Sequence, residues 1–244
     1  MNSRRIYRDW VGGGDLVSFT TTVGTTDLFI RARRDLSREA HSSAVDHRSA
    51  IESYCATHPL FATTLEPLDV DGLAPPIVRD MAAAARIAGV GPLAAVAGAI
   101  AEAVGMDLLA HSDEVIVENG GDVFIATGRR MVVGLYAGDS ILTGRIGLAI
   151  EPAQTPLGVC TSSSTFGHSL SFGRADACTV LARSAALADA MATALCNQIR
   201  SADDLARVLS LSGFPAELLG VLAIVDGRVG IYGAVNLVEV PATT

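Results

Sequence analysis

Patterns of apolar residues divide the first half of the chain into a hairpin followed by helices. A period of two on both sides of Gly24 indicates paired strands, and a helical period indicates three later helices. Proline and glycine commonly follow helix ends, so Pro59 and Gly89 should lie just beyond the first two helices. The third helix opens at Pro92, is apolar nearly all round and should be central. The predicted elements are strands at residues 17–20 and 27–31, helices at 35–57, 77–88 and 92–111, and a linker at 68–76.

The second half of the chain is richer in strands, which are separated by short glycine-rich turns. Ser184 and Ser201 are each expected to cap a helix, the first of which runs to about Ile199. Asp226 and Gly227 form a turn signal between the last two strands. Strands and helices in mixed order favour an α+β fold, with a mixed or antiparallel sheet and packed helices, in a single domain over residues 1–244. The predicted strands are residues 114–118, 122–126, 131–136, 145–150, 157–161, 177–182 and the hairpin 221–232.

Composition narrows the class of protein. Of 244 residues, 50% are hydrophobic and 18% are charged, which is enough for a sizeable core and excludes a disordered chain. The net charge of -8 argues against a general nucleic-acid or anionic-membrane surface. The N-terminal arginines are followed by no apolar segment, so we expect a cytoplasmic protein without a secretory signal. The four cysteines lack zinc-ligand spacing and are expected to be reduced thiols.

Asp189 and Thr193 are the first candidate site residues. They lie four residues apart on a predicted helix, so their oxygens share one face. Magnesium prefers oxygen ligands and needs few carboxylates when substrate phosphates complete its shell. The pair is therefore a candidate magnesium site. The alternative is a helix face on which Asp189 is solvated and Thr193 bonds its own backbone.

Asn119, Gly120, Gly121 and Asp122 form a second candidate site after a predicted strand. Two glycines let the backbone approach a ligand closely and expose its N–H groups. This geometry suits a nucleotide or its phosphates. The alternative is a hairpin turn, because Asn-Gly is a strong two-residue turn signal.

A hydroxyl-rich stretch between Cys160 and His168 is the third candidate site. Thr161, Ser162 and Ser163 open it and could bind phosphate, and His168 could transfer a proton. Cys160 and His168 also have the residue types of a thiolate–imidazole pair. The alternative is a serine-rich turn with a surface histidine.

The three candidate sites, in this order, resemble the ApbE-like superfamily, which includes flavin transferases that move FMN from FAD onto a protein threonine. The matching motifs cover roughly residues 90–200. The chain resembles most closely a short, uncharacterised cytosolic branch, through residues 7–10, 15–19 and 167–172. The motifs are Gly98-Ala-Ile-Ala-Glu102, Asn119-Gly-Gly-Asp122, Cys160-Thr-Ser162 with His168, and Ala188-Asp-Ala-Met-Ala-Thr193.

The resemblance implies an ApbE-like layered fold that binds FAD or FMN with Mg²⁺. Asp189 and Thr193 would hold the metal, with a backbone carbonyl near Gly98. Residues 119–122 and 161–163 would line the nucleotide site, and His168 would transfer a proton. An acceptor protein and further copies of this chain are the macromolecular partners compatible with this reading.

Two departures from the flavin transferases put the reaction in question. Glu102 stands where those proteins carry a lysine, and no Asp-Pro follows His168. The motif that would bind the metal is thus kept, while the residues that would contact the flavin and take part in the reaction are altered. Besides flavin transfer, two alternatives stay open: a non-catalytic flavin-binding or accessory protein, and an enzyme of sulfur or cofactor metabolism in which Cys160 acts.

Overall fold

A large antiparallel sheet forms the centre of the computed structural model, which describes residues 15–138, 140–164, 173–210 and 213–240. Within these residues the sheet has eight strands, and every neighbouring pair is antiparallel. The strand order is β1 (Val17–Val23), β2 (Thr26–Ala32), β3 (Val115–Asn119), β4 (Asp122–Ala126), β7 (Leu157–Ser162), β8 (Ala177–Ala182), β9 (Leu218–Val225) and β10 (Arg228–Gly233). A smaller sheet in the described part of the chain has the order β11 (Leu237–Glu239), β6 (Ile146–Ile150) and β5 (Met131–Gly134).

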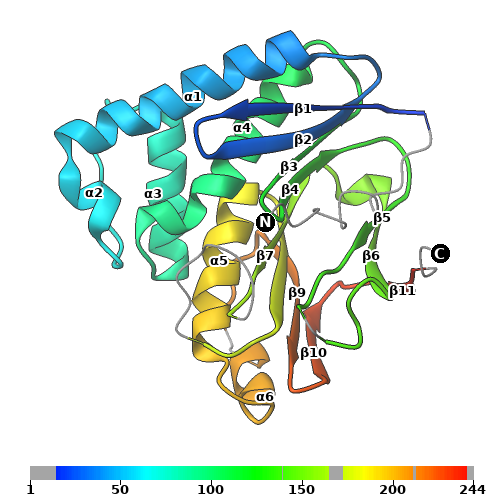
Figure 1. Cartoon of the computed structure of the whole chain (residues 1–244). Helices are drawn as coiled ribbons and strands as arrows, with labels where there is room; N and C mark the ends of the chain where they lie inside the picture. Colours follow the sequence, from blue (N-terminus) through cyan, green and yellow to red (C-terminus); the bar gives the residue numbers. More distant parts are fainter. Residues whose placement is uncertain (1–14, 139, 165–172, 211–212, 241–244) are drawn as a thin grey trace.

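The helices cover one face of the large sheet, and the smaller sheet packs on the other (Figure 1). Successive side chains along a strand point to opposite faces of the sheet, so each strand contributes residues to the core on both faces. Val117 and Phe124 join the helix-side core, whereas Ile116 and Ile125 join Leu148 in the core between the two sheets. The predicted α+β layered class is confirmed. The helical elements are α1 (Ser37–Thr57), α2 (Pro59–Thr63), α3 (Pro76–Ala88), η2 (Pro92–Ala95), α4 (Val96–Leu108), η3 (Pro152–Gln154), α5 (Ala185–Gln198) and α6 (Asp204–Leu209).

Local signals placed most helix ends correctly. Gly89 ends α3 in the left-handed conformation with φ of +73°, and Ser184 caps α5 by accepting a hydrogen bond from the Leu187 amide. Pro59 was expected only to follow a helix, but it opens the short helix α2. Ser201 does not cap α6; the cap position belongs to Asp203.

Some elements differ from the predicted ones because their stability comes from distant partners. The helix predicted from Pro92 begins as a 3₁₀ turn, η2, before α4. Strand β11 lacked a local signal and exists through its pairing with β6. Among the described residues, no single helix is long and apolar enough to cross a membrane, although the pair 76–88 and 92–108, bent by 104°, passes that test together by length and composition.

Candidate functional site

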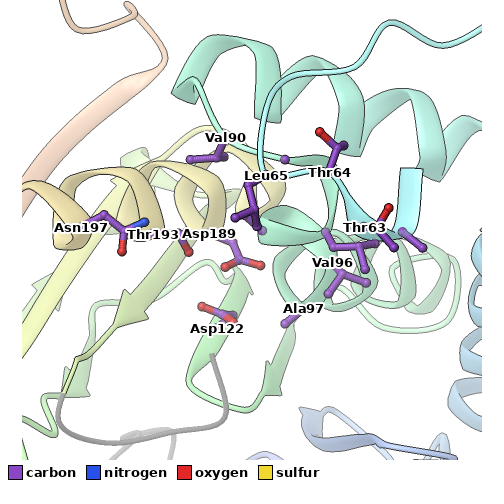
Figure 2. Close-up of a pocket in the computed structure, with 14 residues that line it drawn as sticks. Thr63, Thr64, Leu65, Val90, Val96, Ala97, Asp122, Asp189, Thr193 and Asn197 are labelled. Carbon is purple, nitrogen blue, oxygen red and sulfur yellow. The ribbon is translucent and has the colours of Figure 1, made fainter. Parts of the chain in front are cut away.

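A cavity of about 300 Å³ lies where α5 approaches the segment after α2, the entry to α4 and the start of β4 (Figure 2). Its floor is polar and its walls are mostly small or apolar. The only charged side chains among the described lining residues are two carboxylates. The lining consists of Ala62, Thr63, Thr64, Leu65, Val90, Gly91, Leu93, Ala94, Val96, Ala97, Asp122, Asp189, Thr193 and Asn197.

Asp189 and Thr193 both line this cavity from one face of α5, as their spacing predicts. Asp189 is only 9% exposed, which excludes the alternative of a solvated carboxylate. Its Oδ2 accepts a hydrogen bond from the Gly98 amide at 2.9 Å, in the first turn of α4. Burial raises the pKa of Asp189 to about 7, and the amides of Gly98 and Ala97 oppose that rise.

Asp122 begins β4 and is 8% exposed at the same cavity. Figure 2 shows its carboxyl group next to that of Asp189. Burial and the neighbouring Asp189 raise the pKa of Asp122 well above its ordinary value, and the nearby Cys160 thiol and Thr161 amide oppose the rise. Two buried carboxylates that repel each other are costly unless a proton or a cation lies between them.

The donor set fits a hard cation. Asp122, Asp189 and Thr193 supply only oxygen atoms, and one Asp189 oxygen is already committed to a backbone amide. No group of three or more histidine, cysteine or acidic side chains poised for a metal occurs among the described residues. The arrangement therefore differs from a zinc or calcium cage. It suits Mg²⁺, which keeps several waters and few protein ligands.

The Asn119-Gly120-Gly121-Asp122 motif is a hairpin turn that also anchors α4. Gly120 and Gly121 have φ values of +69° and +110°, which the turn between β3 and β4 requires. The Asn119 side-chain amide donates to the Ala97 carbonyl at 3.0 Å. Of the motif, only Asp122 is among the described lining residues of the cavity. The role predicted for the two glycines beside a nucleotide has no support from this lining.

Cys160 is fully buried on β7, where its thiol donates to the Ala185 carbonyl at 3.3 Å. Burial and the two nearby carboxylates, Asp122 and Asp189, raise the pKa of Cys160 well above its ordinary value. A nucleophilic cysteine needs the opposite environment. These surroundings argue against the predicted thiolate, and we assign Cys160 a packing role. Its predicted partner, His168, lies outside the described residues.

The side chains of Thr161 and Ser162, which follow Cys160, lie on opposite faces of the large sheet. Thr161 and Thr179 share a hydrogen bond between their hydroxyl oxygens at 2.8 Å across β7 and β8. Strand alternation places Thr161 on the opposite face from Cys160, and Ser162 on the same face. Ser162 is buried, Ser163 follows the strand, and none of the three is a described lining residue of the cavity. Their predicted nucleotide contacts stay predictions.

Glu102 has a clear structural role at the position where the resemblance expected a lysine. Its Oε2 accepts hydrogen bonds from the Ser184 hydroxyl at 2.8 Å, the Ala185 amide at 2.7 Å and the Ala186 amide at 3.2 Å. These amides open α5, where a negative charge is favourable. Glu102 is not a described lining residue of the cavity.

One wall of the cavity was not predicted from the sequence. Thr63, Thr64 and Leu65 reach it because the chain passes close to Gly91, where a Cβ atom would lie 2.0 Å from the Thr64 carbonyl oxygen. Nothing in the local pattern of these residues signals a site. Asn197 was also missed, although it follows Thr193 at the same four-residue helical step.

Comparisons with known proteins agree with this architecture. A family model described as AbpE bacteria matches residues 8–224. A UPF0280 protein of Methanocaldococcus jannaschii is 43% identical over 203 residues, which cover 81% of this chain and 82% of the relative. A UPF0280 protein of Methanopyrus kandleri is 45% identical over 228 residues, which cover 89% and 91% of the two chains.

The fold is similar to that of solved flavin transferases. The apo form of Pseudomonas stutzeri flavinyl transferase ApbE gives a TM-score of 0.55 at 13% identity, over 93% of this chain and 95% of that chain. The Vibrio cholerae flavin transferase ApbE gives 0.50 at 13% identity, over 93% and 97%. At this identity the likeness establishes the fold. The chain therefore belongs to the AbpE bacteria family and, with it, to the ApbE-like superfamily that its motifs resemble.

Proposed function

We propose that this protein binds a flavin nucleotide as its magnesium complex and transfers the FMN part of FAD to an acceptor. The observation that carries the proposal is the meeting of Asp122, Asp189 and Thr193 at the floor of one cavity. Asp122 comes from β4, Asp189 and Thr193 come from α5, and all three present only oxygen atoms. The flavin transferases named above have a similar fold, which supports the choice of ligand.

A cation explains the otherwise unfavourable burial of two carboxylates. The Asp189 carboxylate, whose Oδ2 accepts from the Gly98 amide, would hold the metal together with Asp122 and the Thr193 hydroxyl. Bound Mg²⁺ would neutralise phosphate charge and polarise the phosphorus–oxygen bond that breaks. Since the described lining contains no lysine or arginine, a phosphate-bearing ligand depends on that cation to enter.

The walls of the cavity suit a ligand with a planar apolar part. Leu65, Val90 and Val96 line them, while the carboxylates remain at the floor. This separation would place a flavin ring against the apolar wall and its phosphates toward Asp122 and Asp189. In the transfer, an acceptor hydroxyl attacks the FMN phosphorus and loses its proton, and the pyrophosphate bond breaks to release AMP. His168 stays the predicted proton acceptor.

A non-catalytic flavin-binding protein is the second candidate. The observation that favours it is that the Glu102 carboxylate accepts hydrogen bonds at the start of α5. Glu102 therefore supplies no positive charge to a ligand. The buried neutral Cys160 also offers no replacement nucleophile, which weakens the sulfur-chemistry alternative. On this reading the protein holds a flavin for another component and breaks no bond.

Incubation of the pure protein with FAD and Mg²⁺, followed by mass spectrometry, separates these functions. Flavin transfer predicts AMP, together with FMN that is free or attached to protein, and a chelator should abolish both. Thr193→Val should release less AMP than the wild-type protein, because it removes the hydroxyl proposed to bind the metal with little change of shape. Stable FAD binding without AMP would favour the non-catalytic reading, and absence of any flavin binding would refute both.

A further inference from the structure

The first turn of α5 is held by a side chain that no step of the proposed reaction uses. Glu102, on α4, accepts three hydrogen bonds from Ser184, Ala185 and Ala186. Side chains that satisfy helix-opening amides usually belong to the same helix. Here Ser184 caps locally by accepting from Leu187, and Glu102 adds a charged acceptor from a neighbouring helix.

Asp189 makes the reverse contact between the same two helices. Its Oδ2 accepts from the amide of Gly98, in the opening turn of α4, at 2.9 Å. Each helix thus provides a carboxylate for the N-terminal amides of the other. Since both contacts depend on how α4 and α5 lie against each other, a change at one of them is transmitted to the other.

Close packing makes this coupling tight. A Cβ atom on Gly98 would lie 2.2 Å from the Ala185 carbonyl oxygen and 2.8 Å from the Asp189 Cβ. A Cβ atom on Gly158, in β7, would lie 2.3 Å from the Ala185 Cα. Ala185 is therefore enclosed by α4 on one side and the sheet on the other. Interiors packed this closely transmit small displacements instead of absorbing them.

Helical geometry connects this turn to the cavity. Ala185, Asp189 and Thr193 follow one another at four-residue steps, so they share one face of α5. A shift or rotation of the helix at Ala185 moves both cavity-lining residues. The three hydrogen bonds to Glu102 oppose that shift at the end where the helix begins.

We propose that Glu102 is a positioning residue that sets the placement of Asp189 and Thr193 through the opening turn of α5. This role rests on the proposed function, because it matters to a ligand only if those two residues bind one. This positioning role also explains why an acidic residue stands where flavin transferases of the resembled family carry lysine. Loss of the Glu102 carboxylate should loosen the Asp189–Gly98 contact without altering any group that lines the cavity.

Hydrogen–deuterium exchange at the Gly98 amide, read by NMR in the ligand-free protein, tests the placement directly. Glu102→Ala should speed this exchange roughly tenfold at a temperature far below unfolding. Glu102→Gln keeps an oxygen acceptor for the α5 amides and should remain near the wild-type rate. Asp204→Ala is the matched control, because Asp204 accepts from the Arg200 and Ser201 amides beside α6, away from the cavity.

Calorimetry with FAD in the presence of Mg²⁺ measures the consequence for the site. Glu102→Ala should weaken binding roughly tenfold, whereas Glu102→Gln and Asp204→Ala should stay within about twofold of wild type. If Glu102→Ala behaves like Asp204→Ala in both experiments, Glu102 is only a helix cap and the proposal is overturned. If the wild-type protein binds no FAD, the proposed function fails, and exchange at Gly98 alone decides whether Glu102 positions Asp189.

Discussion

Without a cation, the folded protein should lose stability as the pH rises from 5 to 8, because it holds Asp189 beside Asp122 in a buried pocket. Burial raises the pKa of Asp189 from its ordinary 3.8 to about 7. The folded state therefore binds more protons than the unfolded state between these values. Stability that is fully present below pH 3.8 is lost progressively as the pH approaches 7.

The size of the effect follows from this difference in pKa. Each pH unit in the interval changes the free energy of unfolding by about 1.4 kcal/mol per proton. From pH 5 to 8 the loss from Asp189 is about 3 kcal/mol, most of it below pH 7 and little of it beyond. For a chain of this size, that corresponds to a fall in melting temperature of roughly 6–12 °C. Asp122 contributes in the same direction, because its pKa is also raised.

Three other groups with shifted pKa values, Asp204, Cys160 and Cys178, titrate outside this pH range. Hydrogen bonds from Arg207 and from the Arg200 amide lower the pKa of Asp204 to about 2, so its stabilisation is lost only below about pH 4. Cys160 and Cys178 have pKa values raised above the ordinary 9, so both thiols stay protonated throughout the range from pH 5 to 8. Most of the change between pH 5 and 8 should therefore come from the pocket.

Urea unfolding with a chelator present, at pH 5 and pH 8, measures the prediction. Asp189→Asn keeps an oxygen that can accept from the Gly98 amide but does not titrate, so most of the pH dependence should disappear. Millimolar Mg²⁺ should restore stability to the wild-type protein at pH 8 and have little effect at pH 5, since protonated carboxyl groups bind the cation poorly. An equal pH dependence in wild type and Asp189→Asn would refute the reasoning.

Three further predictions test other parts of the structure. Thr193→Val should weaken magnesium-dependent FAD binding in calorimetry with little change in melting temperature; an unchanged affinity would remove Thr193 from the metal site. Gly98→Ala should destabilise the fold by about 3 kcal/mol, because the new methyl would meet the Ala185 carbonyl; a wild-type thermal melt would contradict that close contact. Cys160 should react with iodoacetamide far more slowly than the partly exposed Cys55, as peptide mapping can show, and the reverse order would revive its nucleophilic role.

The sequence alone determined the features that depend on short stretches of chain. The hairpin of β1 and β2, the end of α3 at Gly89 and the start of α5 at Ser184 follow from alternation, from the conformational freedom of glycine and from hydroxyl capping. The shared face of Asp189 and Thr193 also follows from helical spacing. In each case the residues that interact lie within a few positions of one another.

The motif resemblance extended the prediction to the fold class and to the family, both of which are confirmed. It could not tell how individual motif residues are used. Gly120 and Gly121 shape the turn between β3 and β4, Thr161 bonds Thr179 on the sheet face opposite Cys160, and Glu102 caps a helix. A motif identifies which residues recur in a family, whereas their contacts depend on the packing of the whole chain.

Only the tertiary structure decided whether Asp189 is solvated or buried and what lies beside it. Its amide partner Gly98 is 91 positions away along the chain, and Asp122 belongs to a strand in a different layer. Local patterns carry no information about such distances, because the packing of α4 against α5 and the sheet sets them. The same packing brings Thr64 to the cavity through its close approach to Gly91, where any larger residue would move that wall.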